Sequence, residues 1–232
     1  MKRTPLFITL FLAIVSTSAF AQVKRYSSNG MESIFSFSEY TAAGNNVSNK
    51  LRYSAFFHVN HRRHLDLGKS FGLFTGFAIR NVGFIARESD SLTVKRRVYT
   101  AGVPLAFKIG NMEKMKFLYL GAEAELAFNY KEKHFVDGSK EKKFNEWFSQ
   151  RTPLFMPSVF AGIQNKRGFN VYVKYYLTNF FNTGFKEKGI QPNSQREANM
   201  FYISVSYSRK NRKSARTGDK KLPPVNPVTR AY

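Results

Sequence analysis

Glu123 and Glu125 are the residues whose type and spacing could most directly do chemistry. They are two residues apart, so on a β-strand their side chains share one face. Neighbouring carboxyl groups can act as a general acid and a general base. No nucleophile or metal ligand is placed beside them in the sequence. We therefore predict that both carboxylates pair with cations in a structural role.

Histidine and cysteine add no metal or cofactor chemistry. His61 and His64 are three residues apart, which on a strand places them on opposite faces and argues against a shared metal ion. The chain has no cysteine, no phosphate-binding glycine loop and no G-x-S-x-G sequence. The sequence predicts no catalytic residue, metal or cofactor, and a protein that is not an enzyme.

The two glutamates lie in a segment, residues 117–130, whose side chains alternate in polarity. This period of two predicts a strand and excludes an amphipathic helix. A tilted strand of about 9–11 residues crosses a bilayer, whereas globular strands average about 5–6 residues. We expect the apolar face to meet lipid and the other face to line the inside of a barrel. The outward set is Leu118, Leu120, Ala122, Ala124, Leu126, Phe128 and Tyr130, and the inward set is Gly121, Glu123, Glu125 and Asn129.

Seven further segments alternate in the same way, and short turns follow the second, fourth and sixth strands. Longer connectors follow the fifth and seventh, including the charged segment 131–153, which we interpret as a loop. Pro104 cannot donate to a strand ladder and predicts a bulge or local bend. The pattern predicts an all-β fold, an eight-stranded antiparallel up-and-down transmembrane β-barrel. The other predicted strands are 31–40, 50–62, 71–87, 94–109, 154–164, 169–181 and 198–208.

The two ends of the chain differ from the barrel segment. Lys2 and Arg3 precede an apolar run, 6–15, and the small residues of Ala19-Phe20-Ala21, which together are typical of a secretory signal peptide. We predict a signal peptide over 1–21, a barrel over 22–208, and a disordered basic tail over 209–232 in the periplasm. Export and the barrel together predict the bacterial outer membrane.

Ionised side chains on the predicted inner face form a set that we expect to plug the bore as a salt-bridge network. Charges facing lipid would be costly, so they fix the register of each strand. A bore filled in this way should conduct ions poorly. The set is Arg52, His58, Arg80, Arg96, Lys108, Glu123, Glu125 and Lys174.

Three aromatic residues, Phe144, Trp147 and Phe148, lie among charges in segment 131–153. Aromatic side chains can anchor a partner, so they are a candidate binding surface. The alternative is that they form part of an interfacial aromatic belt or pack the loop onto the rim.

A formal net charge of +22 predicts anionic partners. Export argues against nucleic acid. Outer-membrane lipid is the expected partner, with the phosphates of lipopolysaccharide as the candidate group. The tail could bind peptidoglycan or a periplasmic partner, or be solvated with none.

Three stretches of the barrel segment carry a family resemblance: GLFTGFAIRNVGF at 72–84, GVPLAFKIG at 102–110 and FLYLGAEAEL at 117–126. Through them, residues 31–208 resemble the outer-membrane β-barrel proteins of Bacteroidetes, including PorT-like proteins. The resemblance implies a membrane barrel and a link to protein secretion. The chain departs from the usual barrel ending, because Tyr207 closes the last predicted strand and a tail comes after it.

Three functions remain open at this point. The first is a non-enzymatic outer-membrane barrel with a structural or interaction role through its extracellular loops and periplasmic tail. The second is a lipid-modifying enzyme that uses His134 with Ser139 or Ser149. The third is a soluble periplasmic barrel that binds an apolar ligand, which requires apolar side chains to point inward.

Overall fold

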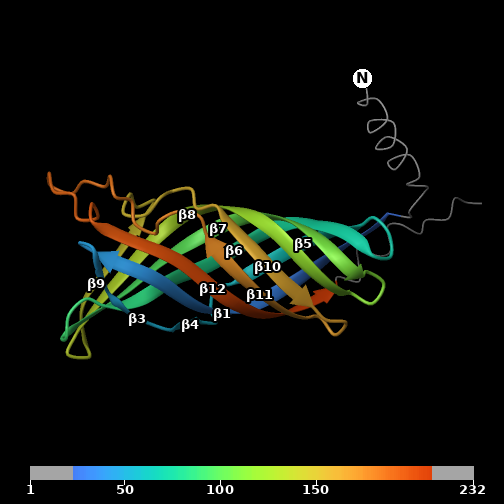
Figure 1. Cartoon of the computed structure of the whole chain (residues 1–232), viewed down its shortest axis with the longest axis horizontal. Coiled ribbons are helices and arrows are strands. Elements are labelled where there is room, and N and C mark those ends of the chain that lie inside the picture. The colour runs from blue at the N-terminus through green and yellow to red at the C-terminus, as the bar shows by residue number, and fades with distance from the viewer. Residues whose placement is uncertain (1–22, 211–232) are drawn as a thin grey trace, which may run out of the picture.

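The computed structural model describes residues 23–210, and the regular elements of this part of the chain are β-strands (Figure 1). The predicted signal peptide and residues 211–232 of the predicted tail lie outside the described residues. The strands are β1 (Lys24–Ala42), β2 (Asn45–Asn46), β3 (Ser48–Lys50), β4 (Arg52–Ser54), β5 (Val59–Asp66), β6 (Phe71–Arg87), β7 (Leu92–Asn111), β8 (Lys116–Val136), β9 (Ser139–Trp147), β10 (Ser158–Gln164), β11 (Phe169–Tyr176) and β12 (Arg196–Lys210).

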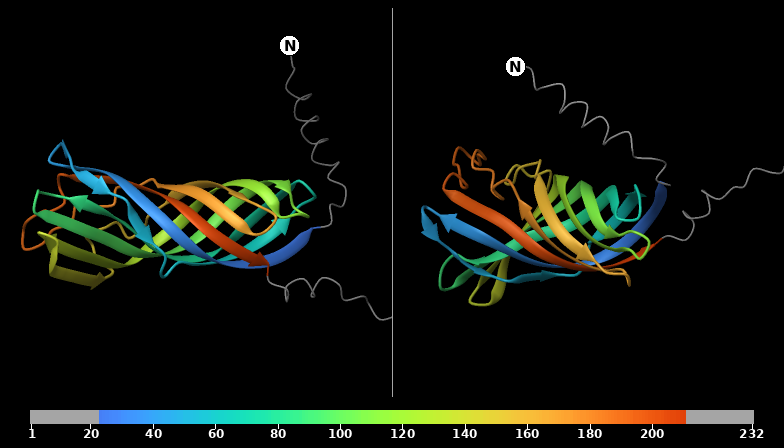
Figure 2. Two further views of the ribbon diagram at one scale, coloured as in Figure 1. Left: turned by 90° about the horizontal axis from the view of Figure 1, so that it is seen from below. Right: turned by 45° about the vertical axis from the view of Figure 1, so that its right-hand side comes forward.

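The strands close into one barrel. Following the pairing from β1 leads through β5, β6, β7, β8, β10, β11 and β12 and back to β1, and every pair is antiparallel. Three short strands, β3, β4 and β5, together occupy the position between β1 and β6. Within it, β3 pairs with β6 and β4 pairs with β1. The eight-stranded antiparallel up-and-down barrel predicted from the sequence is confirmed, and Figure 2 shows its elongated shape.

The two ends of the barrel are different. Three short turns, 67–70, 112–115 and 165–168, join strands at the end where β1 starts and β12 finishes, which we call the turn end (Figures 1 and 2). The β8–β9 hairpin and segment 177–195 lie at the other end, which we call the hairpin end. Short turns on one side and longer connections on the other are typical of outer-membrane barrels.

The prediction of a loop over 131–153 was wrong. β8 continues to Val136, and β9 folds back along it through Asp137 and Gly138. Both turn residues have positive φ, 49° and 83°, as a two-residue type I′ hairpin requires. The sequence concealed this hairpin because charged side chains lie on both of its faces, so the alternation of polarity is lost.

A bulge occurs in the barrel away from Pro104, where the sequence predicted a bulge or a local bend. The β6–β7 pairs omit Pro104 and resume in the same register on either side. The register shifts instead between Tyr99 and Thr100, opposite the stretch of β8 that contains Phe128. An extra residue at a bulge reverses the facing of the residues beyond it. Tyr130, predicted to face outward, is therefore buried inside the barrel.

The outer wall carries an apolar belt. Leu118, Leu120 and Leu126 of β8 are exposed, whereas Glu123 between them is 3% exposed. From Leu118 to Phe128, ten residue steps of about 3.3 Å, tilted by about 40°, span about 25 Å, the height of the apolar band of outer-membrane barrels. The apolar side chains therefore face outward, which is the sidedness of a transmembrane barrel and the opposite of a ligand-binding soluble barrel. No helix within residues 23–210 is long and apolar enough to cross a bilayer.

We expect Ala124→Arg to lower the free energy of unfolding in vesicles by about 2–4 kcal/mol, because Ala124 is exposed near the middle of the belt and would place a guanidinium in hydrocarbon. Denaturant titration of the protein in phospholipid vesicles measures this. Ser139→Arg, at the exposed tip of the β8–β9 hairpin, is the control and should change stability by less than about 0.5 kcal/mol. Equal effects of the two substitutions would show that the belt does not face lipid.

Candidate functional site

A network of buried ion pairs fills the middle of the bore. Lys174 on β11 places its Nζ atom 2.6 Å from Glu123 Oε2 and 2.7 Å from Glu125 Oε1. Arg80 on β6 donates through Nη1 to Glu123 from the facing wall. These four side chains are at most 3% exposed. The structure thus brings together half of the eight ionised residues that the sequence placed in the bore.

Glu32 on β1 belongs to the same network and was missed by the sequence analysis. Its Oε2 atom accepts hydrogen bonds from Arg80 Nε at 3.2 Å and from the Tyr172 hydroxyl at 2.7 Å. Asn60 donates to its other oxygen. Glu32 has the same parity as Ser36, which the alternation of the first strand placed inward. That parity was the signal that could have found it.

The charges of this central network balance. Three carboxylates, those of Glu32, Glu123 and Glu125, face three cations: Arg80, Lys174 and Arg62, whose guanidinium lies within electrostatic range of Glu32. Buried ions are tolerated when they are paired and their remaining hydrogen-bonding capacity is used. Glu125 uses it fully, because it accepts further hydrogen bonds from Thr100, Ser158 and Tyr176.

Gly102 on β7 makes room for these carboxylates. A Cβ atom at this position would lie 2.2 Å from Glu123 Oε1 and 2.9 Å from Glu125 Cγ, which is closer than packing allows. The absent side chain therefore lets both glutamates extend across the bore.

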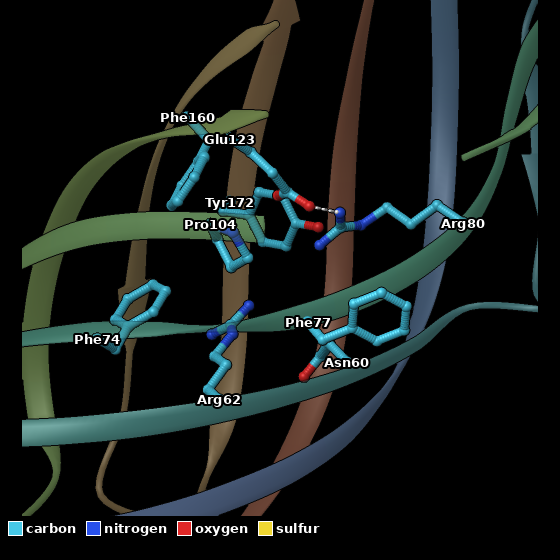
Figure 3. A pocket seen from close by; sticks show the side chains of 9 residues that line it. All are labelled: Asn60, Arg62, Phe74, Phe77, Arg80, Pro104, Glu123, Phe160 and Tyr172. Carbon is cyan, nitrogen blue, oxygen red and sulfur yellow. Dashed lines mark hydrogen bonds and ion pairs between the residues drawn. The ribbon is translucent and has the colours of Figure 1, made fainter. Parts of the chain in front are cut away.

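A small cavity borders the network (Figure 3). Its volume is about 10 Å³, roughly the space of one water molecule. Arg62 lies in its wall with its guanidinium carbon 5.0 Å from the ring centre of Phe74 and 5.9 Å from that of Tyr172. A cavity of this size offers no room for an organic ligand.

Arg96 lies apart from the central network, inside the hairpin end. Its Nη2 atom is 2.6 Å from Glu88 Oε1, and its Nε atom is 3.3 Å from Glu132 Oε2. Burial alone would raise the pKa of Glu132, but the nearby Arg96 charge and the hydrogen bonds from Tyr130 and His134 outweigh it and hold this pKa below its usual value. This group closes the hairpin end of the bore with a second set of paired charges.

Lys108 forms a third group at the turn end. Its Nζ atom is 2.5 Å from Asp66 Oδ1 and 3.3 Å from His64 Nδ1, and the other ring nitrogen of His64 is 2.9 Å from Ser28 Oγ. All four side chains are at most 4% exposed. A serine beside a histidine is a possible catalytic pair in general, but here both are sealed inside the wall.

Arg52 and His58 join none of these groups. They flank the break between β4 and β5, where the wall loses its ladder to β6. Arg52 donates to the backbone oxygen and to Oδ1 of Asn81, at 3.2 and 2.7 Å, and His58 Nδ1 accepts from the backbone N–H of Asn81 at 3.2 Å. Buried backbone groups need such partners. The two side chains replace missing strand pairing.

The three aromatic residues proposed as a loop binding surface do not share one surface. Phe144 on β9 faces inward, against Tyr130 at a ring distance of 6.3 Å. Trp147 is 64% exposed and stacks on Phe128 at 5.9 Å, and Phe148 is exposed beside it. Phe144 therefore packs the hairpin onto the barrel, while Trp147 has the position of a belt residue at the membrane interface.

The alternative catalytic group is also separated in the structure. His134 forms its hydrogen bond with Glu132, and Ser149 donates to Glu146. Ser139 lies at the hairpin turn and forms no hydrogen bond with His134. No group of three or more histidine, aspartate or glutamate side chains within residues 23–210 could hold a metal ion.

Comparison with known proteins gives structural matches only. No family model matches the chain, and no curated protein matches it. Ail, the attachment invasion locus protein of Yersinia pestis, solved with the heparin analogue sucrose octasulfate, is 13% identical over 79% of this chain and 99% of its own, with a TM-score of 0.39. Neisserial surface protein A is 10% identical over 82% and 99%, with a TM-score of 0.40. The N-terminal β-barrel domain of OprF from Pseudomonas aeruginosa is 10% identical over 80% and 100%, with a TM-score of 0.32. At these values the matches assign neither a family nor a ligand to this chain.

We expect Glu32→Gln to lower the free energy of unfolding by about 3–5 kcal/mol, because it leaves the buried Arg80 guanidinium short of a negative charge. Glu39→Gln is the matched control, since Glu39 lies on the same strand but is exposed on its outer face. Its effect should stay within about 0.5 kcal/mol. Denaturant unfolding in vesicles compares them, and indistinguishable curves would mean that the central network contributes no stability.

Proposed function

We propose that this protein is a non-enzymatic outer-membrane barrel that acts as a membrane-embedded platform for interactions. The observation that carries the proposal is the filled bore: three sets of paired charges occupy its length, and the cavity beside the central one holds only about 10 Å³. An eight-stranded barrel is just wide enough for side chains to fill. Its useful surfaces are therefore its ends and its outer wall.

The hairpin end is built as a rigid surface. Arg151, in the segment after β9, lies 2.7 Å from Glu187 of segment 177–195 and stacks over Phe144 at 4.6 Å. The backbone oxygen of Arg151 accepts a hydrogen bond from Asn193 at 3.0 Å. One side chain thus ties the β8–β9 hairpin to segment 177–195. A surface held in one conformation binds a partner at a lower entropic cost than separate flexible loops would.

Two finer parts of the proposal concern partners at the other side of the membrane. The basic tail would reach a periplasmic protein or peptidoglycan from the turn end, where β12 finishes. The resemblance to PorT-like proteins supports protein secretion as the process that the platform serves. Loss of particular secreted proteins from cells lacking the chain, restored by the full-length chain but not by a chain ending at residue 210, would support both parts.

Orientation provides the direct test of the platform. The chain has no cysteine, so each introduced cysteine is a unique label site. We expect Ser139→Cys, at the hairpin tip, to react with a membrane-impermeant maleimide on intact cells. Lys166→Cys, in the 165–168 turn, should react only after the outer membrane is permeabilised. The opposite pattern, or labelling of both sites only after permeabilisation, would contradict a surface platform at the hairpin end.

Conductance provides a second test. In planar bilayers we expect the reconstituted protein to give no steady channel above the lipid background, because the paired charges obstruct the bore. The wild-type protein is compared with the Gly102→Ala variant, whose added methyl group displaces Glu123 and Glu125. A large and steady conductance of the wild-type protein would overturn the proposal that the bore is closed.

A further inference from the structure

A cluster of five cations lies on the outer wall at the hairpin end. It consists of Lys95 and Arg97 on β7, Lys131 and Lys133 on β8, and Lys143 on β9, and we call it the basic patch. The strand register aligns them in two rows. Lys95 is opposite Lys133, which is opposite Lys143, and Arg97 is opposite Lys131.

The basic patch has no internal compensation. None of its five side chains forms an ion pair with a carboxylate within residues 23–210, whereas the inward Arg96 between two of them is paired with Glu88 and Glu132. Partial burial, followed by repulsion from Arg97 and neighbouring lysines, holds the pKa of Lys133 below its ordinary value. Like charges directly opposite on neighbouring strands are destabilising. The chain therefore maintains an unfavourable arrangement of charge on this face.

A guanidinium buried inside the barrel strengthens the positive potential of the basic patch. Arg52 is 1% exposed, and its hydrogen bonds go to the neutral Asn81, so no carboxylate cancels its charge. It lies within electrostatic range of Lys95 and Arg97.

The position of the basic patch relative to the apolar belt indicates its ligand. A row of three aromatic rings lies at the edge of the belt nearest the hairpin end. The Phe128 ring is 6.2 Å from the Tyr99 ring and 5.9 Å from the Trp147 ring. Lys131 Nζ lies 5.2 Å and Arg97 Cζ 5.9 Å from the Tyr99 ring centre. Aromatic girdles mark the depth of the lipid headgroups. The five cations are therefore at the level of the headgroups in the leaflet that faces the hairpin end.

We propose that the basic patch is a binding site for a glycolipid that carries more than one phosphate, of the lipid A type. A glycerophospholipid phosphodiester carries a single negative charge, whereas two rows of cations on three adjacent strands fit several. The acyl chains would lie along the apolar belt below Tyr99 and Phe128, and the phosphates would contact the two rows above. This inference rests on the proposed function, because it requires the barrel to span the membrane with the hairpin end outward.

Trp147 is a built-in reporter for the test. It is the single tryptophan of the chain and stacks on Phe128 at the edge of the basic patch. Detergent-solubilised full-length protein is titrated with bis-phosphorylated lipid A, with its dephosphorylated form and with phosphatidylglycerol, and the Trp147 emission gives each Kd. Native mass spectrometry of the same mixtures gives the number of bound lipids.

We expect the bis-phosphorylated form to bind tightest. Lys131→Gln with Lys133→Gln should weaken its binding about twenty-fivefold, since each lysine near an anionic headgroup contributes about fivefold. Lys114→Gln with Lys116→Gln, in and beside the turn between β7 and β8, removes the same charge at the turn end and should leave the Kd unchanged. If the patch variant fails to fold, Lys143→Gln alone carries the test, with a loss of about fivefold.

Three results would overturn the inference. The protein could bind bis-phosphorylated and dephosphorylated lipid A with equal affinity, or bind phosphatidylglycerol as tightly as bis-phosphorylated lipid A. The third result is an equal loss of lipid affinity in the patch and control variants. The failure of the inference can be distinguished from the failure of the platform. If Ser139→Cys is labelled on intact cells but the protein binds both forms of lipid A equally, the lipid site is rejected and the platform stands. Absence of surface labelling would remove the platform whatever the lipid affinities.

Discussion

The structure depends on the neutralisation of ionised side chains in a bore too narrow to hydrate them. Arg80 and Lys174 reach across the barrel to Glu32, Glu123 and Glu125, and every one of these side chains is nearly inaccessible to solvent. Removing one partner would leave a charge without compensation in a medium of low dielectric constant. Because the partners lie on β1, β6, β8 and β11, the same contacts hold facing walls at a fixed separation.

This constraint divides the protein between an inside that maintains the fold and an outside that is free for function. Inward cations such as Arg96 and Lys108 have carboxylate partners, and the outward cations of the basic patch do not. The difference cannot come from composition, since both kinds of cation lie on β7 within a few residues of each other. It results from environment: an inward cation has to find its partners within the chain, which are carboxylates for Arg96 and the oxygens of Asn81 for Arg52, whereas an outward charge at headgroup depth can be paired by lipid.

Much of the wall was predictable from alternation. The bounds of β6 agree with the predicted strand 71–87, and Glu123 and Glu125 face inward as expected, because a one-residue slip would have moved them into hydrocarbon. Prediction failed where that constraint ends. Beyond Phe128 the strands leave the apolar belt, both faces are polar, and neither the bulge nor the β8–β9 hairpin leaves a period of two in the sequence. Tyr130 was misplaced for that reason.

The sequence by itself determined the barrel, its strand number and the facing of most side chains within the apolar belt, because burial and exposure to lipid impose a separate residue type on each face of a strand. Only the tertiary structure decided how the inward charges divide into groups. Three inward arginines show this, because they look alike in the sequence. Arg52 donates hydrogen bonds to Asn81, Arg96 pairs with Glu88 and Glu132, and Arg80 joins the central network. Their partners are set by the stagger between neighbouring strands and by distances across the bore, and neither quantity is encoded in the alternation along a single strand.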